Sequence, residues 1–327
     1  MTLQKRLVAV GFSKQTAKGA AAAQPTFWMG VTDGKPVNWD LTEDVVEVTS
    51  EKPVFGEVDR TSVVGGADFT GLVHPKAIGL LLYGALGAIA TTGSANPWQH
   101  IITPALDLPY LTFFGRAFGS DYLSVADSKI DELELSWDNA GSLRVAVTMM
   151  GLTLTWGTTP FTPTNDESVG GTPRFRAAGG TFKLDPASGT PIVRNIISGS
   201  LRVRNGLDAV PQAGSVQPGD VAPAVKELEA TINLAPDDLL DIRKALTGAA
   251  GGTTISNVPI FGSFEWFFTI DANTDLKIES SRFQPKPEMP DADPRGGYLE
   301  VGVEGALLQP TSGDAVKATL HNAVTSY

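Results

Sequence analysis

A long stretch of alternating apolar and polar residues at positions 130–156 constrains the fold more than any other part of this sequence. The apolar side chains at every second position are Leu133, Leu135, Trp137, Leu143, Val145 and Val147. A turn sequence, Asp-Asn-Ala-Gly at positions 138–141, separates the two groups. This alternation predicts a long antiparallel β-hairpin with one buried face and one polar face. Its register is fixed, because a slip of one residue would turn every aliphatic side chain to water.

A second hairpin of the same kind is expected near the C-terminus, from strands at positions 276–283 and 298–309. Two helices are expected at positions 76–86 and 239–246, each followed by a capping glycine, Gly87 and Gly248. The order strand, helix, glycine, aromatic strand and hairpin thus occurs twice, at an offset of roughly 155–165 residues. We therefore predict a mainly β chain (α+β) with few helices.

The repeat also predicts the domain organisation. We expect two tandem β-sandwich or barrel domains, residues 1–160 and 161–327, each with one flanking helix and one long hairpin. Residues 157–176, rich in Thr, Pro, Asn and Gly, would form the linker. The first 25 residues are expected to form a flexible N-terminal arm. Trp28 is large and apolar for such a segment, so it should dock on its own domain or on a neighbour.

Composition excludes several classes of protein. The chain of 327 residues has no cysteine, which excludes disulfides and thiolate metal sites. Its net charge of −11 is spread evenly, with 11 basic and 16 acidic residues up to position 160 and 14 and 20 after it. An even acidic balance argues against a protein that grips phosphates. Lys5 and Arg6 precede an apolar run that is too short for a signal peptide or a membrane span, so a cytoplasmic product is expected.

No motif predicts catalysis, a metal or a cofactor. His74, His100 and His321 have no partner at the spacing of metal ligands. Asp291 and Asp293 resemble the start of a calcium loop but lack its glycine and its distal glutamate. A carboxylate pair that meets only in space, as in glycoside hydrolysis, stays open.

The charged faces of the two predicted hairpins say more about function than these motifs do. Five residues form these faces: Glu132, Glu134, Arg144, Glu300 and Glu304. One interpretation is an ordinary solvent face. The other is that the strands continue into neighbouring subunits and form a closed barrel, which removes edges that would otherwise aggregate.

The chain as a whole resembles the phage tail tube proteins of long, non-contractile tails. The likeness lies in the Gly- and Ala-rich segment that ends in Phe27 and Trp28, in GLVHPKAIGLLLYGALG (71–87), in the Trp98-Gln99-His100 loop leading to YLTFF, and in VTMMGLTLTW (147–156). This resemblance implies a structural virion protein, assembled in the host cytoplasm, whose β-sandwich domains form six-fold rings. Such rings stack into a tube through which DNA passes without specific binding.

With two such domains per chain, the resemblance implies a trimer that forms a pseudo-six-fold ring, or a true hexamer if the repeat is illusory. The five hairpin residues named above would face an acidic lumen. Contacts between rings would come from Phe27, Trp28, Gln217, Asp291 and Asp293. The other implied partners are the tape measure and tail terminator proteins.

A different class of function stays open at this point. A monomeric β-sandwich module could bind carbohydrate or a receptor, with Trp98, Tyr110 and Trp266 as stacking platforms. An enzyme ranks third.

Overall fold

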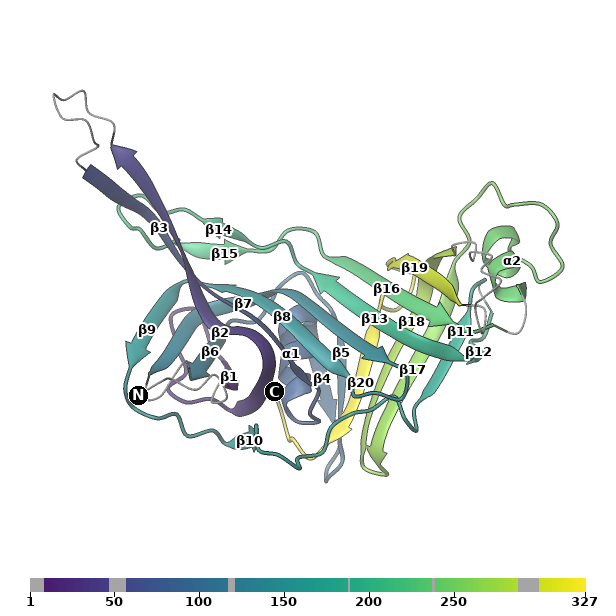
Figure 1. Ribbon diagram of the computed structural model, residues 1–327, viewed down its shortest axis with the longest axis horizontal. Helices are drawn as coiled ribbons and strands as arrows, with labels where there is room; N and C mark the ends of the chain where they lie inside the picture. Colours follow the sequence, from purple (N-terminus) through teal and green to yellow (C-terminus); the bar gives the residue numbers. More distant parts are fainter. Residues whose placement is uncertain (1–8, 47–56, 117–120, 188, 237–238, 288–299) are drawn as a thin grey trace, which may run out of the picture.

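The computed structural model describes residues 9–46, 57–116, 121–187, 189–236, 239–287 and 300–327 (Figure 1). Over these residues the protein is mainly β with two helices, which confirms the predicted fold class. In the first half the elements are β1 (Ala9–Lys14), β2 (Phe27–Val46), β3 (Glu57–Leu72), α1 (Ala77–Leu86), β4 (Gly87–Thr92), β5 (Trp98–Pro104), β6 (Leu111–Arg116), β7 (Tyr122–Asp138), β8 (Arg144–Gly151), β9 (Thr153–Gly157) and β10 (Asn165–Glu167).

The second half continues the same alternation of long strands and one helix. Its elements are β11 (Thr181–Asp185), β12 (Ile192–Val193), β13 (Ile196–Arg204), β14 (Asp208–Val210), β15 (Asp220–Ala222), β16 (Glu227–Leu234), α2 (Leu240–Thr247), β17 (Gly262–Asp271), β18 (Thr274–Pro287), β19 (Val301–Leu307) and β20 (Lys317–Asn322). Both predicted hairpins are present, as β7–β8 and β18–β19.

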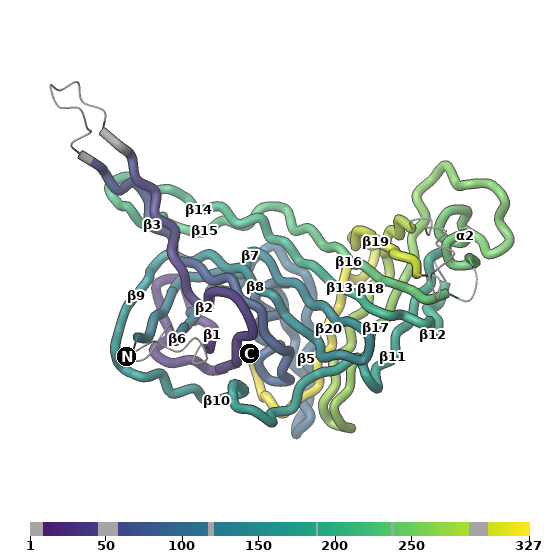
Figure 2. Tube along the Cα trace, in the orientation of Figure 1, coloured from purple at the N-terminus to yellow at the C-terminus, as the bar shows by residue number. Residues whose placement is uncertain are grey.

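One antiparallel sheet of eight strands runs through the whole molecule, in the order β2-β3-β8-β7-β13-β16-β19-β18. Strand β13 of the second half pairs along β7 of the first half, with Ser198 opposite Asp138 and Arg204 opposite Glu132. The two halves therefore meet at a fully hydrogen-bonded strand pair. Figure 2 shows β7, β8, β13 and β16 crossing the molecule side by side.

A second layer packs behind each half of this sheet. Behind the first half its order is β10-β2-β1-β6-β7-β9, since β2 and β7 are long enough to belong to both layers. Behind the second half it is β12-β11-β17-β18-β20-β5-β4. In this layer β20, near the C-terminus, pairs with β5 of the first half.

The strand pairings repeat between the halves. The order β2-β3-β8-β7 recurs as β13-β16-β19-β18, and β1-β6-β7-β9 recurs as β11-β17-β18-β20. Helix α1 follows β3 in the first set, and α2 follows β16 in the second. The topology thus repeats far more clearly than the residues do.

The expected flexible arm and the expected linker are both wrong over the residues that the structure describes. β1 lies between β2 and β6, and Phe12 and Trp28 are buried. Within the predicted linker, Phe175 is buried and the Glu167 carboxylate accepts the N–H groups of Lys76 and Ala77 at 3.2 and 2.8 Å. Glu167 thereby caps α1, whose first turn has no acidic residue of its own.

The core is continuous across the halves and is held at its centre by aromatic rings. Trp137, near the end of β7, inserts into the second half and stacks on Phe182 at 5.2 Å between ring centroids. Trp266 and Phe268 close around it at 4.6 and 5.2 Å. The indole fits because Gly199, on the adjacent β13, has no side chain: a Cβ there would lie 2.5 Å from the Trp137 ring.

Helix α1 offers a sharp test of this packing at Gly79. Replacing glycine by alanine inside a helix ordinarily stabilises it by about 1 kcal/mol. Here a Cβ would overlap the ring of Tyr327, which packs on α1, Phe27 and His100. We expect Gly79→Ala to lower the free energy of unfolding by about 1–3 kcal/mol, measured by urea denaturation. A stabilised variant would show that the Tyr327 ring does not occupy this site.

Candidate assembly surfaces

The polar face of the eight-stranded sheet carries charges of both signs. Glu132 on β7 accepts hydrogen bonds from Nε of Arg202 at 2.5 Å and from Nε of Arg204 at 3.0 Å. Burial raises the pKa of Glu132, but the two guanidinium groups outweigh it, so the pKa lies below its usual range. The carboxylate is therefore charged at neutral pH.

The cross-strand register extends this pattern along the face. On strands β8, β7, β13, β16, β19 and β18 the charged residues that share the face include Glu132, Glu134, Asp138, Arg144, Arg202, Arg204, Glu227, Glu229, Lys286 and Glu304. Of these, six are acidic and four are basic, and three of the four basic residues lie opposite acidic ones across neighbouring strands. The face therefore carries a small acidic excess, and Glu132 engages Arg202 and Arg204.

Both ends of the eight-stranded sheet are open. Residues 31–46 of β2 pair only with β3 among the described residues, and residues 284–287 of β18 pair only with β19. Exposed backbone edges of this length invite pairing with another chain. Pro36 on β2, and Pro285 and Pro287 on β18, are typical of edge strands because proline has no N–H to donate.

Exposed apolar side chains accompany each open end. Beside β2, Trp39 and Trp156 lie with ring centroids 5.9 Å apart and are 46% and 57% exposed. Near the other end, exposed apolar residues gather on β12 and around α2: Ile192, Val193, Leu239, Leu240, Ile255 and Val258. Patches of this kind on a monomer indicate contact surfaces.

Two extensions project from the same end of the sheet. The β2–β3 hairpin continues well beyond the body of the molecule, and the β14–β15 hairpin lies beside it (Figure 1). The N–H of Val63 on β3 donates to the carbonyl of Val216 at 2.8 Å and ties the two together.

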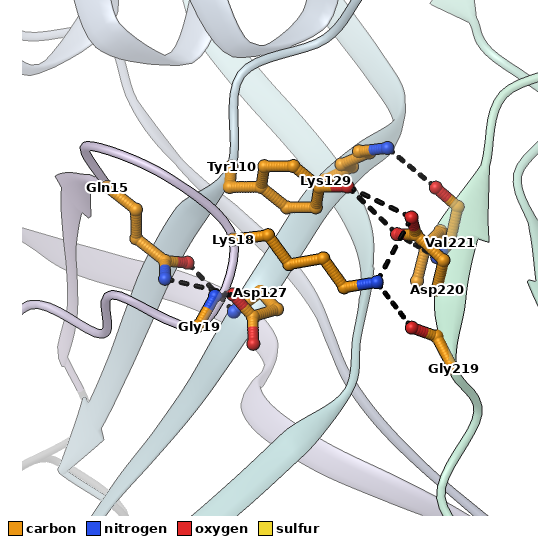
Figure 3. A network of polar contacts seen from close by, with 9 residues as sticks. All are labelled: Gln15, Lys18, Gly19, Tyr110, Asp127, Lys129, Gly219, Asp220 and Val221. Carbon is orange, nitrogen blue, oxygen red and sulfur yellow. Dashed lines mark hydrogen bonds and ion pairs between the residues drawn. The ribbon is translucent and has the colours of Figure 1, made fainter.

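A polar network fixes the base of the β14–β15 extension to the first half (Figure 3). The buried Lys129 ammonium donates to the Val221 carbonyl at 2.6 Å and lies 4.5 Å from the centroid of the Tyr110 ring. The Tyr110 hydroxyl donates to Asp220 at 2.9 Å, and Lys18 forms an ion pair with Asp220 at 3.2 Å. Burial and the neighbouring Asp220 raise the pKa of Tyr110 to about 12, so it stays a donor.

Comparison with known proteins identifies the family of this chain. The sequence profile of one family, described as phage tail tube protein, matches residues 6–320. The chain belongs to the phage tail tube protein family. A search of curated proteins finds no match. As a tail tube protein, the chain is a structural component of the virion that assembles with other subunits into a tube. Neither helix in the described part of the chain is long and apolar enough to cross a membrane.

Four of the five residues predicted to line the tube share one face. Glu132 and Glu134 on β7, Arg144 at the start of β8 and Glu304 on β19 all belong to the polar face described above. Glu300 is exposed just before β19.

The residues predicted to contact other rings are scattered. Phe27 and Trp28 lie in the chain's own core, so their side chains are not available to another ring. Phe27 packs on Phe12 and Tyr327, and Trp28, on the other side of β2, packs on Phe161, which explains their burial. Gln217 is exposed on the loop between β14 and β15. Asp291 and Asp293 lie outside the described residues.

Sequence reasoning missed the open end of the sheet at β2. The apolar residues Trp39 and Leu41 alternate with the polar residues Asp40 and Thr42, which is a pattern that predicts a strand. Pro36 and Pro53 interrupt this pattern on either side. The length of the β2–β3 hairpin follows only from the pairing with positions 57–72.

Proposed function

We propose that three copies of this tail tube protein close laterally into a ring and that such rings stack to form the tube. Each copy supplies two tube domains, residues 1–160 and 161–327. The repeated strand pairing supports this division, and the β7–β13 junction carries it: one chain already contains the contact between two adjacent domains. The same kind of contact, made between copies, closes the ring.

With two domains in each chain, a ring of six domains closes at three copies. Each chain contributes eight strands, so three chains give 3 × 8 = 24 strands in a barrel with alternating domains. The open edge of β2 in one copy then adjoins the open edge of β18 in the next. Such head-to-tail contacts use two different surfaces and end only when the ring closes. Closure removes the edges that would otherwise promote aggregation.

The polar face of the sheet lines the lumen in this proposal, with Glu132, Glu134, Arg144, Glu300 and Glu304 among its residues. The ion pairs of Glu132 support passage of DNA, because Arg202 and Arg204 are bound to its carboxylate and so do not bind the phosphates of DNA. In this proposal the lumen does not hold DNA, chiefly because carboxylates neutralise the cations of the lumen wall. A small excess of acidic residues adds repulsion of the phosphates.

Contacts between rings come from the two extensions, including Gln217, and from Asp291 and Asp293. The tape measure protein inside the tube and the tail terminator at its end are the expected partners.

The alternative of a carbohydrate- or receptor-binding module has little support. Trp266 is fully buried in the aromatic core, and Tyr110 belongs to the network that holds the β14–β15 extension. These side chains cannot stack on a ligand. A true hexamer of chains, with the second half as decoration, would leave the repeated topology of that half without a role.

Microscopy of the purified protein tests the proposal directly. We expect rings or tubes with three-fold symmetry and six similar domains in each ring, seen by negative stain and by cryo-electron microscopy. Six chains per ring would overturn the stoichiometry. A particle that stays a monomer at every concentration would overturn assembly itself.

A further inference from the structure

Helix α2 and the loop that follows it enclose an apolar groove with a volume of about 420 Å³. Its apolar lining consists of Leu239, Ile242, Leu246 and Ile255. Ile255 is 67% exposed, so the groove is open along one side. The helix beneath it is anchored by ion pairs of Asp241 with Arg194 at 2.6 Å and of Lys244 with Asp185 at 2.7 Å. Because these ion pairs hold α2 in place, the groove is already formed before a partner binds.

At the opposite open end of the sheet, Trp39 and Trp156 present two indole rings that nothing in the described chain covers fully. Tryptophan buried in a pocket is among the side chains that contribute most to protein interfaces. Backbone pairing alone is a weak source of affinity at the β18 edge, because Pro285 and Pro287 remove two N–H donors from it. Side chains beside these edges must therefore supply much of the contact.

The junction inside the chain shows how such a contact is arranged. There, the residue that follows β13 is Asn205, which is buried and donates from Nδ2 to the Ala85 carbonyl at 3.1 Å. Lys226, just before β16, donates to the same carbonyl at 2.6 Å. The incoming hairpin of one domain thus touches the last turn of the helix of the preceding domain.

The repeat in topology identifies the equivalent residue at the junction between copies. Leu72 of β3 pairs with the first residue of β8, and Leu234 of β16 pairs with the first residue of β19, so the two positions correspond to within one residue. Moving back by the same number of residues from these two positions reaches Gly65 on β3, opposite Trp39, and the start of β16, opposite the end of β13. Trp39 therefore lies within about one residue of the position that corresponds to Asn205. The helix equivalent to α1 is α2, whose last turn contributes Leu246 to the groove.

We propose that the Trp39–Trp156 pair of one copy docks into the α2 groove of the next copy in the ring. This inference rests on the proposed trimeric ring and names the surfaces that close it.

Chemical cross-linking tests the docking without removing either tryptophan. The chain has no cysteine, so a variant with Leu41→Cys and Thr253→Cys carries one thiol near Trp39 and one in the groove. With a short bis-maleimide, we expect covalent dimers and a closed trimer on a denaturing gel. The matched control joins Leu41→Cys to Leu106→Cys, since Leu106 is 93% exposed and lies on the loop between β5 and β6, outside the groove.

The outcomes separate the two proposals. Rings that form in the same sample but cross-link no more than the control would overturn the docking and leave the ring intact. If the unsubstituted chain forms no rings, both proposals fail. As a second measurement, Trp39→Ala should raise the protein concentration needed for rings by about tenfold or more, with the unfolding midpoint unchanged. An unchanged concentration would also overturn the docking.

Discussion

Replacing Trp137 by alanine should lower the free energy of unfolding by about 3–5 kcal/mol, the largest stability effect we expect from a single substitution. Trp137 is only 4% exposed and is the side chain of the first half that fills the aromatic core of the second. Its loss leaves a cavity that Gly199 cannot fill. Urea denaturation of the disassembled chain, followed by circular dichroism, measures the change.

Leu106→Ala provides the control for this prediction, because Leu106 is almost fully exposed. Its effect should stay within about 0.5 kcal/mol. If Trp137→Ala lowers the free energy of unfolding by less than about 1 kcal/mol, the two halves are stable without the cluster of aromatic side chains around Trp137. An unfolding transition that splits into two would show instead that Trp137 couples them.

Replacing Glu132 by glutamine should slow DNA ejection by about tenfold or more at low salt, because it frees two guanidinium groups on the face proposed to line the tube. In a ring of three chains, six guanidinium groups, those of Arg202 and Arg204, would then lose their hydrogen-bonded carboxylate partner. Binding of cations to phosphates weakens steeply with salt, so raising the salt concentration should restore ejection. Ejection from phage assembled with the variant, at several salt concentrations, measures the effect.

Glu265→Gln is the matched control, since Glu265 is also ion-paired, with Lys183 at 2.6 Å, but lies on β17 outside the eight-stranded sheet. Its ejection rate should equal that of the parent. Equal rates for both variants, with tubes intact, would show that the Glu132 face does not line the lumen.

The elements recovered from sequence were those with a strong local signal. The alternation around Leu133 and Trp137 gave the first hairpin, and Gly87 and Gly248 marked the helix ends, where both residues have positive φ. Four of the five predicted lumen residues share one face for the same reason, since alternation settles which side of a strand a residue takes.

The remainder depends on contacts between residues distant in the chain. No local pattern shows that β13 pairs with β7, that β20 pairs with β5, or that β1 lies between two other strands. The sequence suggests a loop at Trp98-Gln99-His100, but these residues lie in β5, which pairs with β4. Apolar residues such as Phe27 look available in sequence until a partner strand covers them.

The strand pair between β7 and β13 also bears on how a tube begins to grow. In the proposed ring, every second lateral contact is made within a polypeptide and cannot be lost by dilution. Linking two binding modules makes their encounter intramolecular, at a high effective concentration. Closing a ring then requires three molecules to meet instead of six, so nucleation should depend on about the third power of the subunit concentration.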